Sequence, residues 1–284
     1  MKRFDPSRRH LLAGALAFSG VAPLPSPAFA DEDEQITIAA PDGRSISLSI
    51  WRPQTVRAAV MFSHGSGGRP QNYPALMQTY RDAGLLVAAP LHVDSLEHPL
   101  RGQFDRIQTF RARYEDVVGA LNTLQTMAPS APQAVSGHSF GGLMSFVAGG
   151  GFPPMITGAL PSVKAVVAFS DAGVIPNIVD ENTYAGLTIP SLMITGDQDV
   201  IGAVSDWHEH LYPIEHSPAG DKVALVYAGG SHNLIGGARG PDANSDDAIA
   251  DGADFVLAHA ARDSAAMARI AALVSNDIRQ VIRH

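Results

Sequence analysis

Residues 133–148 carry the sequence Gln-Ala-Val-Ser-Gly-His-Ser-Phe-Gly-Gly-Leu-Met-Ser-Phe-Val-Ala. The first four residues are typical of a buried strand and the last seven of a helix, so the chain must turn sharply over Gly137–Gly141. A strained turn of this kind lifts a serine hydroxyl clear of the sheet, where a histidine base can activate it. The stretch therefore predicts a strand–turn–helix unit that presents Ser139 as a nucleophile.

Candidate partners for this serine follow in the chain order nucleophile, acid, base. The apolar run 189–195 ends in Gly-Asp-Gln-Asp-Val at 196–200, and the run 222–227 leads into Gly-Gly-Ser-His at 229–232. Because the carboxyl ends of parallel strands lie along one edge of a sheet, these loops can meet at Ser139. We predict Asp199 as the acid and His232 as the base.

Two other carboxylates remain open as the acid. Asp197 lies in the same turn as Asp199, and Asp171 directly follows another strand-like run, 163–169. Both stand after a strand, which is where the acid is expected.

An oxyanion hole is expected upstream of the nucleophile. The strand-like run 58–62 leads into Ser-His-Gly-Ser-Gly-Gly at 63–68, a glycine-rich loop. Acyl transfer builds negative charge on a carbonyl oxygen, and fixed backbone N–H groups stabilise that charge. We predict the N–H groups of Ser66 and Phe140 as the donors.

Strand and helix patterns alternate along the rest of the chain. Strands are expected at 35–38, 45–51, 58–63, 85–90, 133–137, 163–169, 190–195 and 222–227, and helices at about 72–83, 104–127, 140–149, 203–211 and 245–279. This alternation predicts an α/β class fold with a mostly parallel, twisted sheet of about eight strands and helices on both faces. Too few residues separate the helix at 140–149 from the next strand for a lid domain, so we expect a minimal lid, with 171–187 as a small flap.

Four motifs in this order resemble the α/β-hydrolase superfamily: His64-Gly65-x-Gly67-Gly68, Gly137-x-Ser139-x-Gly141, Gly196-x-x-Asp199 and Gly230-Ser231-His232. The resemblance spans residues 36–280 and implies the α/β-hydrolase fold and a serine esterase. Within the superfamily the chain is similar to dienelactone-hydrolase-like, platelet-activating-factor-acetylhydrolase-like and cutinase-like enzymes. True dienelactone hydrolases use a cysteine nucleophile, and this chain has no cysteine.

Residues 1–30 are expected to be a twin-arginine-type signal peptide. Arg8-Arg9 precedes a short apolar stretch, and Ala28-Phe29-Ala30 is typical of a cleavage site. The apolar stretch is shorter than the roughly 20 residues that a membrane span needs, so no stable membrane insertion is expected. We predict a periplasmic or secreted protein that uses the Tat export machinery, with 31–284 as a single catalytic domain.

Charge and the remaining polar residues exclude several functions. A net charge of −8 argues against nucleic acid as a partner, because such binding needs basic patches. No known zinc-ligand spacing is present, so no metal and no cofactor are expected. The histidines at 208, 210 and 216 and the arginines at 101, 106, 111 and 113 are interpreted as solvated surface residues.

These observations favour an exported serine hydrolase that cleaves a small-molecule, lipid or polymer ester through an acyl-enzyme on Ser139. In this mechanism His232 moves the proton and Asp199 holds the imidazole. Two alternatives are a peptidase or amidase that uses the same three residues, and a non-catalytic binding protein on a hydrolase scaffold.

Overall fold

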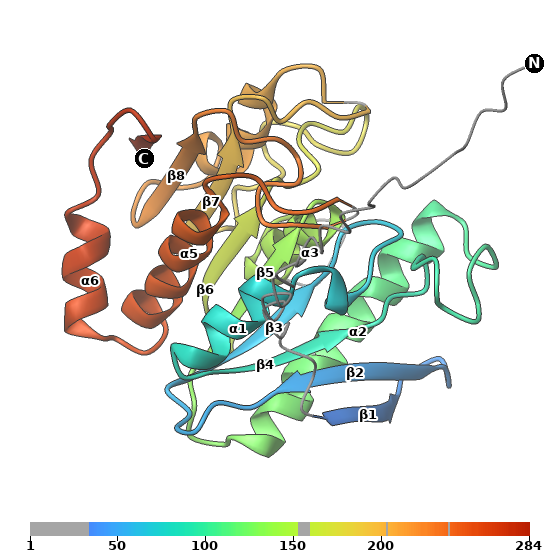
Figure 1. The fold of residues 1–284 in the computed structure, drawn as a ribbon. Helices are drawn as coiled ribbons and strands as arrows, with labels where there is room; N and C mark the ends of the chain where they lie inside the picture. The colour runs from blue at the N-terminus through green and yellow to red at the C-terminus, as the bar shows by residue number, and fades with distance from the viewer. Residues whose placement is uncertain (1–33, 153–159, 203, 238) are drawn as a thin grey trace, which may run out of the picture.

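One mixed sheet forms the centre of the molecule (Figure 1). The computed structural model describes residues 34–152, 160–202, 204–237 and 239–284, so the predicted signal peptide lies outside the described residues. Within them, nine strands pair in the order β1-β2-β4-β3-β5-β6-β7-β8-β9. The strands are β1 (Glu34–Ala39), β2 (Ser45–Trp51), β3 (Ala58–Ser63), β4 (Leu85–Pro90), β5 (Gln133–His138), β6 (Val163–Phe169), β7 (Ser191–Gly196), β8 (Lys222–Tyr227) and β9 (Arg279–Arg283).

The six central strands, β3 to β8, are parallel, and the antiparallel pairs lie at the edges. The strands predicted at 35–38 and 45–51 form the antiparallel hairpin β1–β2, which joins the sheet through β2 beside β4. β3, β4, β5, β7 and β8 are buried along their whole length, as expected for parallel strands covered on both faces. The carboxyl ends of β5, β7 and β8 therefore lie near one another at one edge of the sheet.

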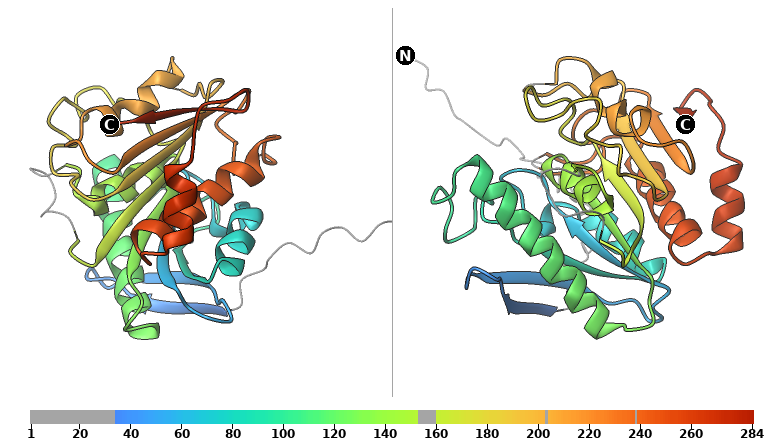
Figure 2. Two further views of the ribbon diagram at one scale, coloured as in Figure 1. Left: turned by 90° about the vertical axis from the view of Figure 1, so that its left-hand side faces the viewer. Right: turned by 180° about the vertical axis from the view of Figure 1, so that it is seen from behind.

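Helices cover both faces of the sheet (Figures 1 and 2). On one face, α1 (Pro74–Asp82), α5 (Ser245–His259) and α6 (Ser264–Ala271) enclose an apolar core that includes Phe62, Tyr80 and Phe169. On the other face, α2 (Arg106–Met127), α3 (Phe140–Gly149) and α4 (Tyr212–Glu215) enclose a second core. Two short 3₁₀ turns, η1 (Pro70–Asn72) and η2 (Trp207–Leu211), complete the described elements. No helix in the described part of the chain combines the length and apolarity that crossing a membrane requires.

The C-terminal region differs from the sequence prediction. A helix was expected to continue to residue 279, but α6 ends at Ala271 and residues 279–283 form β9, antiparallel to β8. Arg279 fixes this strand by an ion pair with Asp251 on α5, 2.8 Å away, and Asp251 also accepts a hydrogen bond from the Tyr227 hydroxyl. These contacts join residues far apart in sequence, so no local pattern could indicate them.

Two shorter predictions were also wrong. The helix expected at 203–211 is the 3₁₀ turn η2 followed by the single turn α4, which begins next to Pro213. The segment 171–187 was expected to face the substrate as a flap. Instead Tyr184 and Leu187 are buried in the core on the α3 side, where the Tyr184 ring packs edge-on against Phe146.

Candidate active site

Ser139 stands at the turn between β5 and α3 with a left-handed backbone, φ 55° and ψ −123°. A non-glycine residue in this region is strained, and such strain persists only where its surroundings enforce it. The flanking glycines permit the turn, because a Cβ on Gly137 would collide with the carbonyl of Gly141 and one on Gly141 with the carbonyl of Ser63. The predicted strand–turn–helix unit is thus present, and it places Ser139 at the carboxyl edge of the sheet.

His232 and Asp199 are directly bonded to each other. His232 Nδ1 lies 2.9 Å from Asp199 Oδ1, and the Thr195 hydroxyl donates to Asp199 Oδ2 at 2.8 Å. The Asp199 side chain is fully buried, whereas that of His232 is 16 % exposed. Burial acts to raise the pKa of Asp199, but hydrogen bonds from two histidines outweigh it and hold that pKa well below its usual range. Asp199 is therefore an ionised acceptor for the His232 ring.

The two alternative acids have other partners. Asp197 accepts the Gly229 N–H at 2.8 Å and stands in the exposed part of the turn. Asp171 is fully buried and contacts His210 rather than His232. Among the three carboxylates, the contact to His232 belongs to Asp199.

Ser139 and His232 share one cavity of about 540 Å³. Its wall also includes the loop 65–69, Tyr73, the segment 95–97 and Asn233. The structure thus brings Ser139 to the same cavity as the histidine that is bonded to Asp199. The described residues contain no hydrogen bond between the Ser139 hydroxyl and His232, and their catalytic roles remain predictions.

Three of the four backbone N–H groups in the loop 65–68 have acceptors among the described residues. Gly65 donates to the Tyr73 hydroxyl at 3.1 Å, Gly67 to Asp94 Oδ2 at 3.3 Å and Gly68 to the carbonyl of Gly65 at 3.0 Å. Within the described residues, only the N–H of Ser66 in this loop lacks an acceptor. Phe140 occupies the first position of α3, where an N–H has no partner inside the helix. The two N–H groups predicted for the oxyanion hole are therefore both available.

Arg113, on α2, is buried against the loop 64–68. Its interpretation as a solvated surface residue was therefore wrong. Its side chain is fully buried, and its guanidinium donates to the carbonyl of His64 at 2.8 Å and to that of Gly65 at 3.3 Å. The same group forms a two-pronged ion pair with Asp94, whose other contact is the Gly67 N–H. Although burial opposes the charge of Asp94, Arg113 holds the pKa of Asp94 well below its usual range. One buried arginine thus fixes both carbonyls and one N–H of the loop.

Tyr73 and His138 connect the oxyanion loop to the loop of the base. His138 Nε2 donates to the carbonyl of His232 at 2.7 Å, so Nδ1 is left as the acceptor of the Tyr73 hydroxyl at 2.9 Å. Burial and the neighbouring His232 lower the pKa of His138 to about 3, which agrees with a neutral ring. The hydrogen bonds from Gly65 through Tyr73 and His138 therefore fix the position of the His232 backbone relative to Gly65.

His64 and His92 form a second neutral pair under the same loop. The His64 ring bonds to the carbonyl of Gly65 at 2.7 Å and accepts the His92 N–H at 3.1 Å. His92 in turn contacts Ser63 and the buried carboxylate of Asp116, each at 2.8 Å. Burial lowers the pKa of both histidines well below the usual value. Hydrogen bonds from both rings therefore brace the loop.

His210 was wrongly interpreted as a surface residue. It is fully buried and lies within hydrogen-bond distance of both Asp171 and Asp199, whereas His208, two positions earlier, is exposed. The donor atoms of Asp199, His210 and His232 lie within 4.8 Å of one another, a spacing at which three ligands can hold a metal. Hydrogen bonds already account for these contacts, the shortest being 2.9 Å. The contacts of His210 join residues far apart in sequence, so the sequence pattern did not indicate that this histidine is buried.

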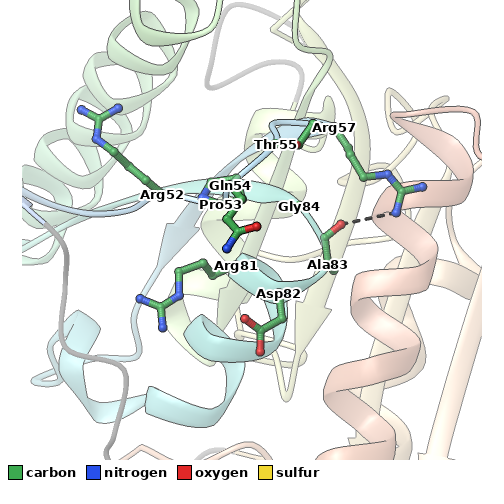
Figure 3. A pocket seen from close by; sticks show the side chains of 9 residues that line it. All are labelled: Arg52, Pro53, Gln54, Thr55, Arg57, Arg81, Asp82, Ala83 and Gly84. Carbon is green, nitrogen blue, oxygen red and sulfur yellow. Dashed lines mark hydrogen bonds between the residues drawn. The ribbon is translucent and has the colours of Figure 1, made fainter.

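A larger cavity of about 670 Å³ lies away from Ser139, where β3 and β4 begin (Figure 3). It is lined by Arg52, Arg57 and Arg81 together with Asp82 and the turn at Gly84. Arg57 is already paired with Asp263, and no histidine or serine lines this cavity. The hydroxyl of Thr55 also lines it, but no histidine is present there to activate a hydroxyl, so the candidate active site is the smaller cavity at Ser139.

Comparison with known proteins agrees with this geometry. No family model matches the chain. It is 29 % identical to a monoglyceride lipase of Rattus norvegicus over 120 residues, which are 42 % of this chain and 39 % of that lipase. It is 28 % identical to a monoacylglycerol lipase of Mycolicibacterium smegmatis over 205 residues, 66 % of this chain and 69 % of that lipase. The chain therefore spans about two fifths of the length of the rat relative and about two thirds of the mycobacterial one.

A solved structure supports the same fold. A soluble variant of monoglyceride lipase from Saccharomyces cerevisiae, in complex with a substrate analog, superimposes with a TM-score of 0.63 and 14 % identity. The match covers 83 % of this chain and 98 % of the yeast chain. The sheet order, the strained serine turn and these similarities lead to one conclusion: the chain has the α/β-hydrolase fold, and it is similar in sequence to monoglyceride lipases.

Proposed function

We propose that this chain is a serine hydrolase that cleaves carboxylic esters through an acyl-enzyme on Ser139. The observation that carries the proposal is the bonded pair His232–Asp199 on the same cavity as a serine in a strained turn. His232 takes the Ser139 proton as the hydroxyl attacks the ester carbonyl, and it then returns the proton to the leaving alcohol. Water attacks the acyl-enzyme in the same manner and releases the acid.

The proposed oxyanion hole completes this mechanism. The N–H groups of Ser66 and Phe140 are the free donors next to Ser139, and α3 adds the positive end of its dipole. Loss of one such donor typically costs about 3 to 4 kcal/mol of transition-state stabilisation. These donors are already fixed in place, whereas water would have to reorient around the developing negative charge. The transition state is therefore stabilised more by the site than by water.

We further propose monoacylglycerols, or esters of similar size, as the substrate class. The names of the relatives support this choice, and the cavity offers both polar groups and the apolar side chain of Leu96. A glycerol ester has a polar alcohol part and an apolar acyl part, which matches a mixed lining.

The test uses p-nitrophenyl esters from acetate to palmitate and a monoacylglycerol, with wild type, Ser139→Ala and Ser205→Ala. Ser205 is exposed and does not line the cavity, so it is the matched control. We expect Ser139→Ala to lose about 10³-fold or more of kcat, with the control unchanged. A fluorophosphonate probe should label wild type and fail with Ser139→Ala. Full ester turnover by Ser139→Ala would refute the mechanism, and turnover of amides alone would favour the peptidase alternative.

Export is proposed on the leader sequence alone. The twin arginines Arg8-Arg9 and the site at Ala28–Ala30 support passage through the Tat machinery to the periplasm or medium. Replacing both arginines by lysine should leave the protein in the cytoplasm of a host with a Tat system. Unchanged export of that variant would contradict the proposal.

A further inference from the structure

Asp199 has a second histidine partner besides His232. His210, on η2, places Nε2 3.2 Å from Asp199 Oδ1 and 3.2 Å from the backbone carbonyl oxygen of the same residue. The His210 side chain is fully buried, and its ring centroid lies 6.4 Å from that of His232. The proposed acid therefore lies between two histidines, one facing the cavity and one in the core.

The other side of His210 contacts a second buried carboxylate. His210 Nδ1 lies 3.3 Å from Asp171 Oδ1, and the Gly173 N–H donates to that same oxygen at 3.0 Å. Asp171 follows Ser170, a non-glycine residue with a left-handed backbone at φ 46°. Strain of this kind persists where the surrounding structure enforces it, and here it directs a carboxylate toward His210.

The partners of the ring determine where its protons lie. The carbonyl of Asp199 can only accept, so Nε2 carries a hydrogen. Burial raises the pKa of Asp171, but the contact with His210 and the Gly173 N–H favour its ionised form. An ionised carboxylate can only accept, so Nδ1 also carries a hydrogen. A histidine that donates from both nitrogens is an imidazolium cation.

We propose that His210 is a positioning residue, held as an imidazolium between Asp171 and Asp199, which fixes the carboxylate that orients His232. This deepens the proposed function and rests on it only for the kinetic consequence, because the charge of His210 follows from its own contacts. The cation keeps Asp199 ionised and holds it from the side opposite His232.

The electrostatics of the surrounding groups support the cation. Burial alone would lower the pKa of His210, but the carboxylates of Asp171 and Asp199 outweigh it and raise that pKa to about 10. The other titratable groups that face the cluster are His232, His138, whose ring lies 4.8 Å from that of His232, and Tyr184 beside Asp171. Neither His138 nor Tyr184 adds a charge at neutral pH, because the pKa of His138 is lowered to about 3 and that of Tyr184 is raised by burial.

The direct experiment is side-chain ¹⁵N NMR of the histidines in the full chain between pH 6 and 9. We expect one histidine with two protonated ring nitrogens over this range, and its loss in His210→Gln. A His210 ring that is neutral at pH 8 would overturn the proposal. Dialysis against EDTA should leave the signal unchanged, whereas a change would assign the three donor atoms to a metal instead. This arm does not depend on activity, so it remains decisive if no ester is turned over.

The kinetic experiment compares wild type with His210→Gln and Asp171→Asn, and uses His208→Gln on the same 3₁₀ turn as the matched control. We expect kcat to fall about 10- to 100-fold in the first two variants with KM within about twofold, because Asp199 acts through His232 and not on the substrate. Without the cation, Asp199 stabilises protonated His232 more strongly. The acid limb of the kcat/KM profile of His210→Gln should therefore move to higher pH by about 0.5 to 1 unit.

Each result of this comparison decides the proposal. The proposal would be overturned if both variants kept the kcat and the acid limb of the wild type. It would also be overturned if His208→Gln lost as much kcat as His210→Gln. A fall in kcat without a moved acid limb would indicate a packing role only, and would also overturn it. If His210→Gln does not fold, Asp171→Asn keeps the histidine in place and removes only one carboxylate.

Discussion

The guanidinium of Arg113 lies over the ring of Phe140, with Cζ 4.4 Å from the ring centroid. Phe140 directly follows Ser139, and Arg113 also donates to the carbonyls of His64 and Gly65. One buried cation therefore touches both sides of the proposed oxyanion hole, the loop after β3 and the first residue of α3.

Replacement of Arg113 should lower kcat far more than it changes KM. Arg113→Met removes the guanidinium donor from the His64 carbonyl and the Asp94 carboxylate and one of several donors from the Gly65 carbonyl, so the loop that carries the Ser66 N–H is held less firmly. We expect kcat to fall about 10²-fold or more, comparable with the loss of one oxyanion donor. The free energy of unfolding should fall by about 3 kcal/mol, because the partly buried Asp94 loses its ion-pair partner.

Two controls separate position from stability in that experiment. Arg113→Lys keeps the charge but loses the planar fork, so it should recover stability better than kcat. Arg111→Met, on the exposed face of the same helix, should leave both quantities unchanged. Full activity in folded Arg113→Met would contradict the role given to the guanidinium.

Gly65→Ala should impair the site by steric contact alone. A Cβ at this position would lie 3.0 Å from His138 Nδ1 and 3.3 Å from Ser139 Cβ, tighter than normal packing allows. Since the shift falls on the nucleophile and on its neighbour, we expect kcat to fall by about 10²-fold. Gly240→Ala is the control, because a Cβ there meets nothing within 4 Å. An active Gly65→Ala enzyme would show that the loop can move away without cost.

Asparagine at each of the three candidate acids will identify the residue that acts. Asp199→Asn should reduce kcat by about 10⁴-fold, because an amide permits the wrong tautomer of His232. Asp197→Asn should stay near wild type, since that carboxylate accepts from the Gly229 N–H and the Gln198 amide and does not contact His232. Steady-state kinetics on one p-nitrophenyl ester suffice. The assignment would be wrong if Asp197→Asn or Asp171→Asn proved more damaging than Asp199→Asn.

The buried neutral histidines should make the fold sensitive to acid. The pKa of His138 is lowered to about 3, and those of His64 and His92 lie well below the usual value. In the unfolded chain each of them binds a proton near pH 6.5, so stability is lost as the pH falls from about 6.5 toward 3. Each histidine contributes up to about 1.4 kcal/mol per pH unit.

Urea unfolding at several pH values between 7.5 and 4.5 measures this loss. His138→Gln should show a shallower dependence than wild type, because one proton-linked group is removed. His210 acts with the opposite sign: its pKa is raised to about 10, so its contribution is complete below about pH 6.5 and is lost as the pH rises through 10. A stability that does not change between pH 7.5 and 5 would contradict the neutral state of the three rings.

The sequence predicted what depends on local patterns. Glycines around Ser139 and short apolar runs ending at Asp199 and His232 are visible along the chain, and they indicated the turn and the edge where the loops meet. Arg113 and His210 were misjudged because a charged residue within a helix or turn usually faces solvent, and only the packed structure shows that they are buried. β9 was missed for the same reason, since Arg279 pairs with Asp251, 28 positions away.

The hydrogen bonds among the loops that line the cavity also determine how the protein unfolds and loses activity. Tyr73, His138 and Arg113 bond together the loops that follow β3, β5 and β8, so these three loops of the cavity wall do not detach independently. Regions bonded in this way open together as one cooperative unit rather than by local fraying. On heating, catalytic competence and the folded sheet should therefore disappear in a single step, with no inactive but folded species between them.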